Sequence, residues 1–318
     1  MEEKQIRKWL RRQFRTVGWA LVVYYAIMNI LVVISVISDM ISQALQKFAS
    51  GAYPFLPDMD AIANNAWGYL VSIAVGLVIL YAWKGSDFFR WEIFAKGRPM
   101  EVGVFFGTLC LCSGAQLVNS LWITLLEAFL NLFGLSALGI LESVSGQSDS
   151  FSMFLYSALA APIAEEILFR GFVLRSLRPF GKRFAIFGSA LLFGLFHGNL
   201  LQTPYAFLVG LVLGYVALEY SVFWAIGLHM FNNLVLADML SRLTAFLPEH
   251  IASMIQLLIL GCFTLAGAVI LLVKRREIGA YNRSEWMDRR CLKCFFLNSG
   301  VLVMILIALV NMAAMVFV

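Results

Sequence analysis

Two adjacent carboxylates and an arginine stand in an otherwise apolar stretch of this chain. The segment is APIAEEILFR, residues 161–170, among Ala, Ile, Leu and Phe. Further along, His197 ends the segment FGLFH, and His229 and Asn233 begin and end the segment HMFNN. Ionisable side chains are costly inside a hydrocarbon layer and usually face a cavity there, which makes these residues candidates for a functional site.

Helical spacing separates the roles of the two glutamates. Glu166 and Arg170 are four positions apart, so their side chains stack on one helix face and can neutralise each other at low dielectric. Glu165 points about 100° away around the helix and has no such built-in partner. His229 and Asn233 share one face by the same spacing. We therefore predict that the Glu166–Arg170 pair is structural and that Glu165 is available for chemistry.

These side-chain types suit the attack of water on a carbonyl group. A glutamate can act as a general base, and an imidazole can share a proton with water or bind a metal. A second imidazole and an amide can donate hydrogen bonds to a developing oxyanion. Each feature alone has a plainer explanation, such as an ion pair between helices, a transport element or a packed histidine, and the spacing leaves these alternatives open.

The composition indicates where such residues must lie. Of the 318 residues, 61% are hydrophobic and 14% are charged, whereas a soluble domain carries about 25% charged residues. We therefore expect an all-α protein, a polytopic transmembrane helical bundle of eight or nine spans, each needing about 20 apolar residues. Gly210 and Gly214 have the GxxxG spacing of closely packed membrane helices. The predicted spans are 17–38, 63–83, 102–132, 152–174, 184–199, 204–220, 222–240, 251–273 and 295–318.

The basic residues test this map, because cytoplasmic loops of membrane proteins carry an excess of Lys and Arg. With the N-terminus in the cytoplasm, the alternation of spans leaves only Lys47 and Arg242 in the outer loops. The cytoplasmic basic groups then lie in residues 4–15, 84–98, 175–183 and 274–293. We predict a multi-pass protein of the plasma membrane with a cytoplasmic N-terminus. The net charge of +5 follows from this topology, and we expect no nucleic-acid partner.

Depth along the helices brings the four candidates together. At 1.5 Å per residue from the inner membrane boundary, Glu165 lies about 15 Å deep and His197 about 21 Å deep. By the same rise, His229 and Asn233 lie about 10 and 17 Å deep. All four are near the middle of a hydrocarbon core about 30 Å thick. The sequence therefore predicts one site assembled from three helices.

The three segments resemble the motifs of one protein family. EEILFR reads as EExxxR, FGLFH as FxxxH and HMFNN as HxxxN, in this order and each within a predicted span. The arrangement resembles the CPBP intramembrane proteases (CAAX protease and bacteriocin processing, also called Abi), and it covers about residues 155–240. The HExxH motif of site-2 zinc proteases is absent from the sequence.

The resemblance implies a CAAX-protease-like core that hydrolyses peptide bonds in membrane proteins or peptides. It implies that Glu165 and His197 activate water and that His229 and Asn233 stabilise the oxyanion. Glu166 and Arg170 match the supporting pair of the family motif. The expected partners are membrane lipids and a peptide or membrane-protein substrate.

The family is described both as metalloproteases and as metal-free glutamate proteases, and the sequence leaves both mechanisms open. If a metal is used, the side chains that could hold Zn²⁺ are those of Glu165, His197 and His229. We expect four segments in the chain. They are a basic amphipathic lead-in (1–16), N-terminal transmembrane helices (17–150), the CPBP-like catalytic core (151–245) and C-terminal helices with a basic cytoplasmic loop (246–318).

Two functions other than proteolysis fit the same residues. A non-catalytic relative can act by binding, in bacteriocin immunity or as a scaffold for partners. A transporter of protons or small solutes can use Glu165 and His197 as a relay. The sequence lacks the paired interrupted spans that transporters often show in their two halves, so the relay is the least favoured reading.

Overall fold

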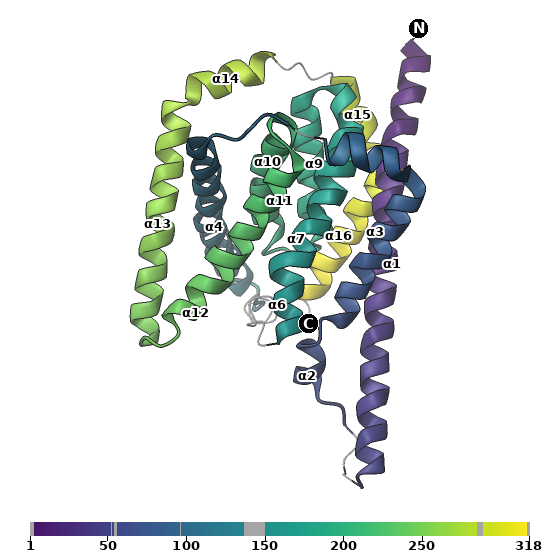
Figure 1. Cartoon of the computed structure of the whole chain (residues 1–318), viewed down its shortest axis with the longest axis vertical. Coiled ribbons are helices and arrows are strands. Elements are labelled where there is room, and N and C mark those ends of the chain that lie inside the picture. The colour runs from purple at the N-terminus through teal and green to yellow at the C-terminus, as the bar shows by residue number, and fades with distance from the viewer. Residues whose placement is uncertain are drawn as a thin grey trace.

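Helices are the only regular elements in the part of the chain that the computed structural model describes, which is residues 3–51, 53, 56–95, 97–136, 150–284 and 289–316 (Figure 1). The predicted all-α class is confirmed. The elements are α1 (Glu3–Ala49), α2 (Met59–Ala63), α3 (Trp67–Phe88), η1 (Phe89–Ile93), α4 (Val102–Asn131), α6 (Phe151–Phe154), η2 (Leu155–Ala160), α7 (Ala161–Glu166), η3 (Ile167–Leu174), α8 (Arg175–Leu177), η4 (Arg178–Phe180), α9 (Lys182–Phe196), α10 (Thr203–Glu219), α11 (Val222–Phe231), η5 (Asn232–Met239), α12 (Leu240–Thr244), α13 (Glu249–Val273), α14 (Arg275–Ser284), α15 (Arg289–Phe296) and α16 (Ser299–Val316).

Several of these helices are long and apolar enough to cross a membrane alone, so the chain is a multi-pass membrane protein. Among the described residues there are 5 such segments, or 6 if α15 and α16, which meet at a 58° bend, form one span. Each coincides with a predicted span. The remaining predicted spans, 184–199, 204–220 and 222–240, are also helical, but they are shorter or composed of several elements. The total of eight or nine spans stays a prediction.

The shorter helices fill the centre of the bundle, and the longer ones surround them (Figure 1). α10 packs along α9 and also contacts α4 and α11, while α7 contacts α11 and η3. Every residue of η3 is buried. At the periphery, α13 packs on α4, and only 6% of its most apolar stretch of 18 residues is buried by other parts of the protein. A helix that is apolar all round but uncovered by protein must face lipid, so α13 marks an outer surface of the bundle.

Small residues let the central helices approach closely. A Cβ atom added to Gly210 would lie 3.1 Å from Ala190, and one added to Gly214 would lie 3.3 Å from Ile186. Both neighbours belong to α9, so the predicted GxxxG contact is the α9–α10 interface. A second close approach was not predicted. A Cβ atom on Gly18 of α1 would lie 2.6 Å from the backbone of Gly300 on α16, so the two ends of the chain pack backbone to backbone.

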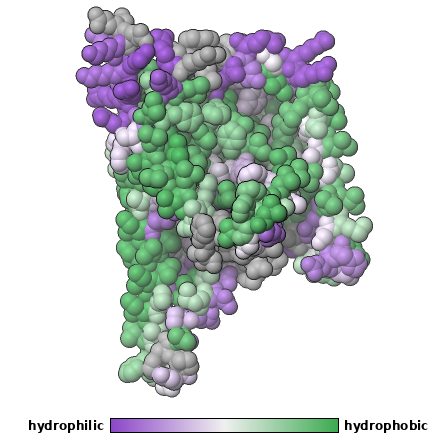
Figure 2. Space-filling model, turned by 180° about the vertical axis from the view of Figure 1, so that it is seen from behind, coloured by the Kyte–Doolittle hydropathy of each residue, from purple (hydrophilic) through white to green (hydrophobic). Residues whose placement is uncertain are grey.

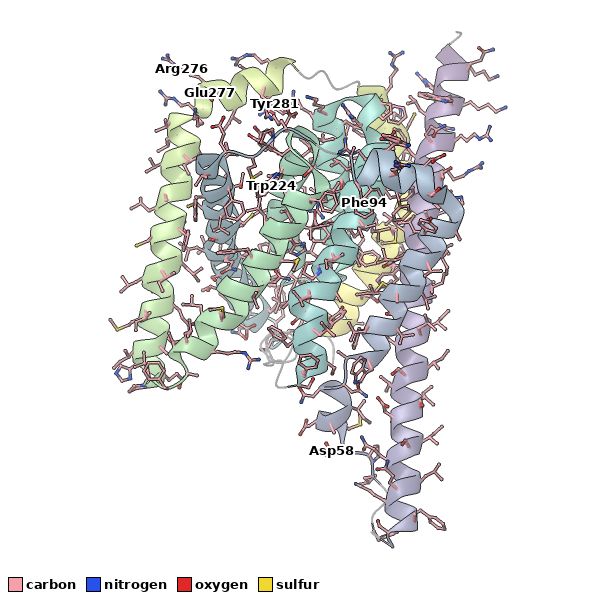
Figure 3. The ribbon with its side chains drawn as sticks, viewed as in Figure 1. Asp58, Phe94, Trp224, Arg276, Glu277 and Tyr281 are labelled. Carbon is pink, nitrogen blue, oxygen red and sulfur yellow. The ribbon has the colours of Figure 1, made fainter. Side chains whose placement is uncertain are left out.

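Polar residues gather at the two ends of the bundle, and a hydrophobic band lies between them (Figure 2). The end that carries the N-terminus also carries α14, including Arg276 and Tyr281 (Figures 1 and 3). At this end Glu219 accepts hydrogen bonds from Lys182 at 2.9 Å and from Tyr281 at 3.0 Å. We call it the basic end. Asp58, which caps α2, lies at the opposite end (Figure 3).

Candidate active site

The candidate residues lie on three neighbouring central segments. Glu165 and Glu166 end α7, which continues without a break into η3 and Arg170. His197 follows the last residue of α9, where Gly198 adopts a positive φ of 57° and turns the chain out of the helix. A left-handed glycine is a common helix stop because it has no Cβ atom to clash. His229 lies near the end of α11.

The predicted ion pair between Glu166 and Arg170 is present. Glu166 Oε1 and Arg170 Nη1 are 3.0 Å apart, and both side chains are fully buried. The guanidinium also lies 4.2 Å from the centre of the Phe193 ring. A buried charge is stable only with such partners, and the contact between Arg170 and Phe193 joins η3 to α9 within the core.

Glu166 has a second partner that the sequence did not indicate. Its Oε1 atom accepts a hydrogen bond from His229 Nδ1 at 2.9 Å. An ionised carboxylate only accepts hydrogen bonds, so Nδ1 must carry the proton. This contact turns Nε2 of the same ring toward the other glutamate, and it lies 3.8 Å from Glu165 Oε2. Residues 63 positions apart make this contact, and no local spacing signals it.

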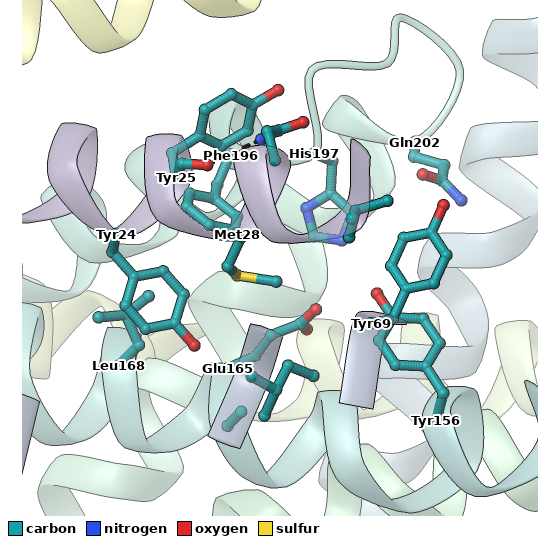
Figure 4. A pocket seen from close by; sticks show the side chains of 14 residues that line it. Tyr24, Tyr25, Met28, Tyr69, Tyr156, Glu165, Leu168, Phe196, His197 and Gln202 are labelled. Atoms are coloured by element: carbon teal, nitrogen blue, oxygen red, sulfur yellow. Dashed lines mark hydrogen bonds between the residues drawn. The ribbon is translucent and has the colours of Figure 1, made fainter. Parts of the chain in front are cut away.

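Glu165 and His197 line one cavity of about 300 Å³, and Figure 4 shows both side chains pointing into it. The Glu165 side chain keeps 25% of its surface exposed, in contrast to the buried Glu166. Nδ1 of His197 lies 2.9 Å from the Phe193 carbonyl oxygen, which can only accept. Neutral His197 therefore presents Nε2 as an acceptor. The exposed carboxylate of Glu165 is consistent with its predicted availability for chemistry, which stays a prediction.

Asn233 and His229 lie behind this cavity rather than in its lining. Asn233 Nδ2 donates to the Ser157 carbonyl of η2 at 3.3 Å. Its Oδ1 accepts from Asn232 Nδ2, also at 3.3 Å, and the same Asn232 amide donates to Tyr205 at 2.8 Å. Glu165 thus shares a cavity with His197 and lies 3.8 Å from His229 Nε2. Asn233 is held in an amide network beside them.

Phe193 forms a wall between the candidate residues and does not face lipid. Its side chain is buried. Its ring meets the His197 ring edge-on at 4.9 Å and the His229 ring at 5.9 Å. With Arg170 on its face as well, this one aromatic ring contacts both imidazoles and the buried cation. It fixes the orientation of both histidines by packing.

Much of the cavity wall comes from helices far from the motifs. Tyr24 and Tyr25 of α1, Tyr69 of α3 and Tyr156 of η2 line it (Figure 4). The rings of Tyr69 and Tyr156 are 5.0 Å apart. Asn311 of α16 donates to the Tyr25 hydroxyl at 2.6 Å. The sequence analysis missed these tyrosines, because nothing in their spacing links them to the EExxxR, FxxxH and HxxxN motifs.

The three side chains that could hold Zn²⁺ do not form a ready ligand set. Within the described part of the chain, no group of three His, Cys, Asp or Glu side chains lies close enough together to hold a metal ion. Nε2 of His229, the ring nitrogen that does not bond to Glu166, lies 3.8 Å from Glu165 Oε2. As placed, the three side chains do not converge on one point, so no step below depends on a metal.

The fold and the site together define a polytopic helical membrane protein with a glutamate–histidine site inside the bundle. Comparison with protein-family models matches residues 147–235 to the family described as type II CAAX prenyl endopeptidase Rce1-like. This match confirms the resemblance drawn from the three motifs, which all lie within the matched segment. The searches of curated proteins and of solved structures find no match.

Proposed function

We propose that the chain is an intramembrane endopeptidase in which Glu165 and His197 activate water for attack on a peptide carbonyl. The observation that carries the proposal is the placement of these two side chains in one cavity within a hydrophobic bundle. Glu165 has exposed carboxylate oxygen, and His197 offers the lone pair of Nε2, so both can accept a proton from one water molecule.

His229 and Asn233 are the proposed hydrogen-bond donors to the oxyanion, and the protonation of His229 decides whether it can donate. With Nδ1–H bonded to Glu166, neutral His229 presents only a lone pair at Nε2. Stabilisation of an oxyanion by His229 therefore requires the doubly protonated imidazolium, which donates from both nitrogens. Two glutamates lie beside the ring and can stabilise that positive charge. Asn233, whose position is fixed by Asn232, is the second proposed donor.

The test is cleavage by a variant that keeps the size of the glutamate. Glu165→Gln removes the base, and general-base catalysis contributes about 10²–10⁴-fold, so cleavage should fall by that order. Glu127→Gln is the matched control. That glutamate lies in α4, away from the cavity lining, and accepts a hydrogen bond of 2.8 Å from Ser136. Membrane peptides from cells with each variant are compared by mass spectrometry. Unchanged cleavage products with Glu165→Gln would overturn the proposal.

A further inference from the structure

The cavity and the basic end of the bundle lie at different depths. On α1, the last basic residue of the N-terminal group is Arg15, while the cavity lining begins at Tyr24 and continues to Val32. At 1.5 Å per residue these two residues lie about 14 and 26 Å beyond Arg15. The cavity therefore starts near the middle of a hydrocarbon core about 30 Å thick and extends away from the basic end.

Two other helices give the same depth independently. On α3, Ile73 and Tyr69 lie about 17 and 23 Å from Lys84 by the helical rise. On α9, His197 lies about 21 Å from Arg183 by the same measure. All these residues line the cavity, whereas the basic residues stand at the opposite ends of the same helices.

Toward the basic end, the cavity is bounded by apolar side chains. Leu168 and Tyr24 form its floor and are buried. On the turns that follow Leu168 in the same helix, toward the basic end, the side chains of Phe169, Phe172 and Leu174 are fully buried. A second hollow shares Tyr24 and Leu168 with the cavity and runs between α1 and α3 to Thr16 and Trp83, near the basic end. It is lined mostly by apolar residues such as Val23 and Ile79, which suit hydrocarbon rather than water.

The opposite rim carries polar side chains. Asn29 of α1 is exposed, and Gln202 lies in the turn between α9 and α10 with its side chain partly exposed. Figure 4 shows Gln202 and the Tyr69 hydroxyl beside His197. Polar groups at one side and a packed apolar floor at the other indicate that water and peptide reach Glu165 from the rim.

We propose that the catalytic cavity is entered from the extracytoplasmic side, and that its substrates are peptide segments exposed on that side of the membrane. Four groups of basic residues lie toward the basic end, and basic loops are retained in the cytoplasm. The rim faces the other way. This inference rests on the proposed hydrolytic function for what enters, but the side of entry is measured separately.

The experiment is labelling of single introduced cysteines with a membrane-impermeant thiol reagent, in intact cells and in inverted membrane vesicles. Gln202→Cys reports the rim. Two exposed positions of α1 report the ends: Arg12→Cys at the basic end and Leu45→Cys at the other. The full chain with its five native cysteines is the baseline. Equal membrane amounts and gel-filtration profiles show that each variant is folded.

We expect Gln202→Cys and Leu45→Cys to be labelled several-fold above the baseline in intact cells, and Arg12→Cys only in inverted vesicles. Labelling of Gln202→Cys solely in inverted vesicles, or from neither side, would overturn entry from outside. Labelling of Arg12→Cys in intact cells would overturn the orientation on which it rests. None of these outcomes affects the Glu165→Gln test, so failure of the access side and failure of the hydrolytic function are distinguishable.

Discussion

One oxygen atom of Glu166 serves two partners, because Oε1 lies 3.0 Å from Arg170 Nη1 and accepts the Nδ1–H of His229 at 2.9 Å. The ion pair expected from the sequence is therefore also a support for the candidate site. Glu166 is a positioning residue, since it sets the tautomer of neutral His229 and aims Nε2 at Glu165.

Because Glu166 bonds both Arg170 and His229, a pair of variants can distinguish its effect on stability from its effect on cleavage. Glu166→Leu leaves Arg170 buried without its partner, and breaking a buried pair from one side costs about 3–5 kcal/mol. Replacing both residues, in Glu166→Leu/Arg170→Met, removes both charges and should recover most of the thermal stability in detergent. Cleavage should stay low in the double variant, because His229 still lacks its acceptor. A double variant with wild-type cleavage would show that Glu166 acts only as a structural ion pair.

The amide network behind the cavity makes a second prediction. The Tyr205 hydroxyl accepts from Asn232 at 2.8 Å and from Gln116 at 3.2 Å. Tyr205→Phe removes the acceptor of one N–H of buried Asn232 and one of half-buried Gln116, and each unmet buried donor costs about 1–3 kcal/mol. Released from Tyr205, Asn232 no longer orients Asn233, so kcat should fall while KM changes little. The exposed Tyr81 supplies the control Tyr81→Phe; equal kinetics in the two variants would contradict the role of the network.

The contact between α1 and α16 makes a third prediction, on stability alone. A Cβ atom on Gly18 would lie 2.6 Å from the Gly300 backbone, so Gly18→Ala forces the two helices apart. Overpacking of this kind costs about 1–3 kcal/mol. Gly227 on α11 has no atom within 4 Å of an added Cβ, and Gly227→Ala should be neutral or slightly stabilising. The unfolding temperatures of the two purified variants test the difference. Equal temperatures would mean that the two helices can separate without loss.

Metal dependence is the fourth prediction. Since Glu165, His197 and His229 do not converge as ligands, cleavage should persist after chelation, and the purified protein should carry no stoichiometric zinc. Elemental analysis before and after dialysis against a chelator is the measurement, together with cleavage. Stoichiometric zinc that disappears in His197→Ala would contradict this expectation and identify a site that closes only around the metal.

Local spacing was sufficient to predict the helices and the Glu166–Arg170 pair. Apolar runs of helical length identify membrane segments because each must satisfy its own backbone hydrogen bonds. The pair follows from an interval of four residues on one helix. The exposure of Glu165 beside a buried Glu166 also follows, since adjacent residues point about 100° apart on a helix.

Contacts between distant segments were not accessible in the same way. The bond between Glu166 and His229 depends on how α7 and α11 cross, and the tyrosines of the cavity depend on where α1 and α3 pack. The count of eight or nine spans stays a prediction for a related reason. The helices α9 and α10 match the predicted spans 184–199 and 204–220, but they are shorter than the spans that cross a membrane by length alone and lie in the centre of the bundle.

The hydrogen bond from Asn311 to Tyr25 bears on how small a working enzyme can be made. Tyr25 lines the cavity from the first helix, and Asn311 braces it from the last, while the motifs occupy the middle of the chain. A fragment of residues 151–245 would keep every motif residue but lose the cavity walls formed by α1 and α3 and the bond from Asn311 that positions Tyr25. The proposed proteolysis therefore depends on nearly the whole polypeptide, and a search for a minimal active fragment should keep both α1 and α16.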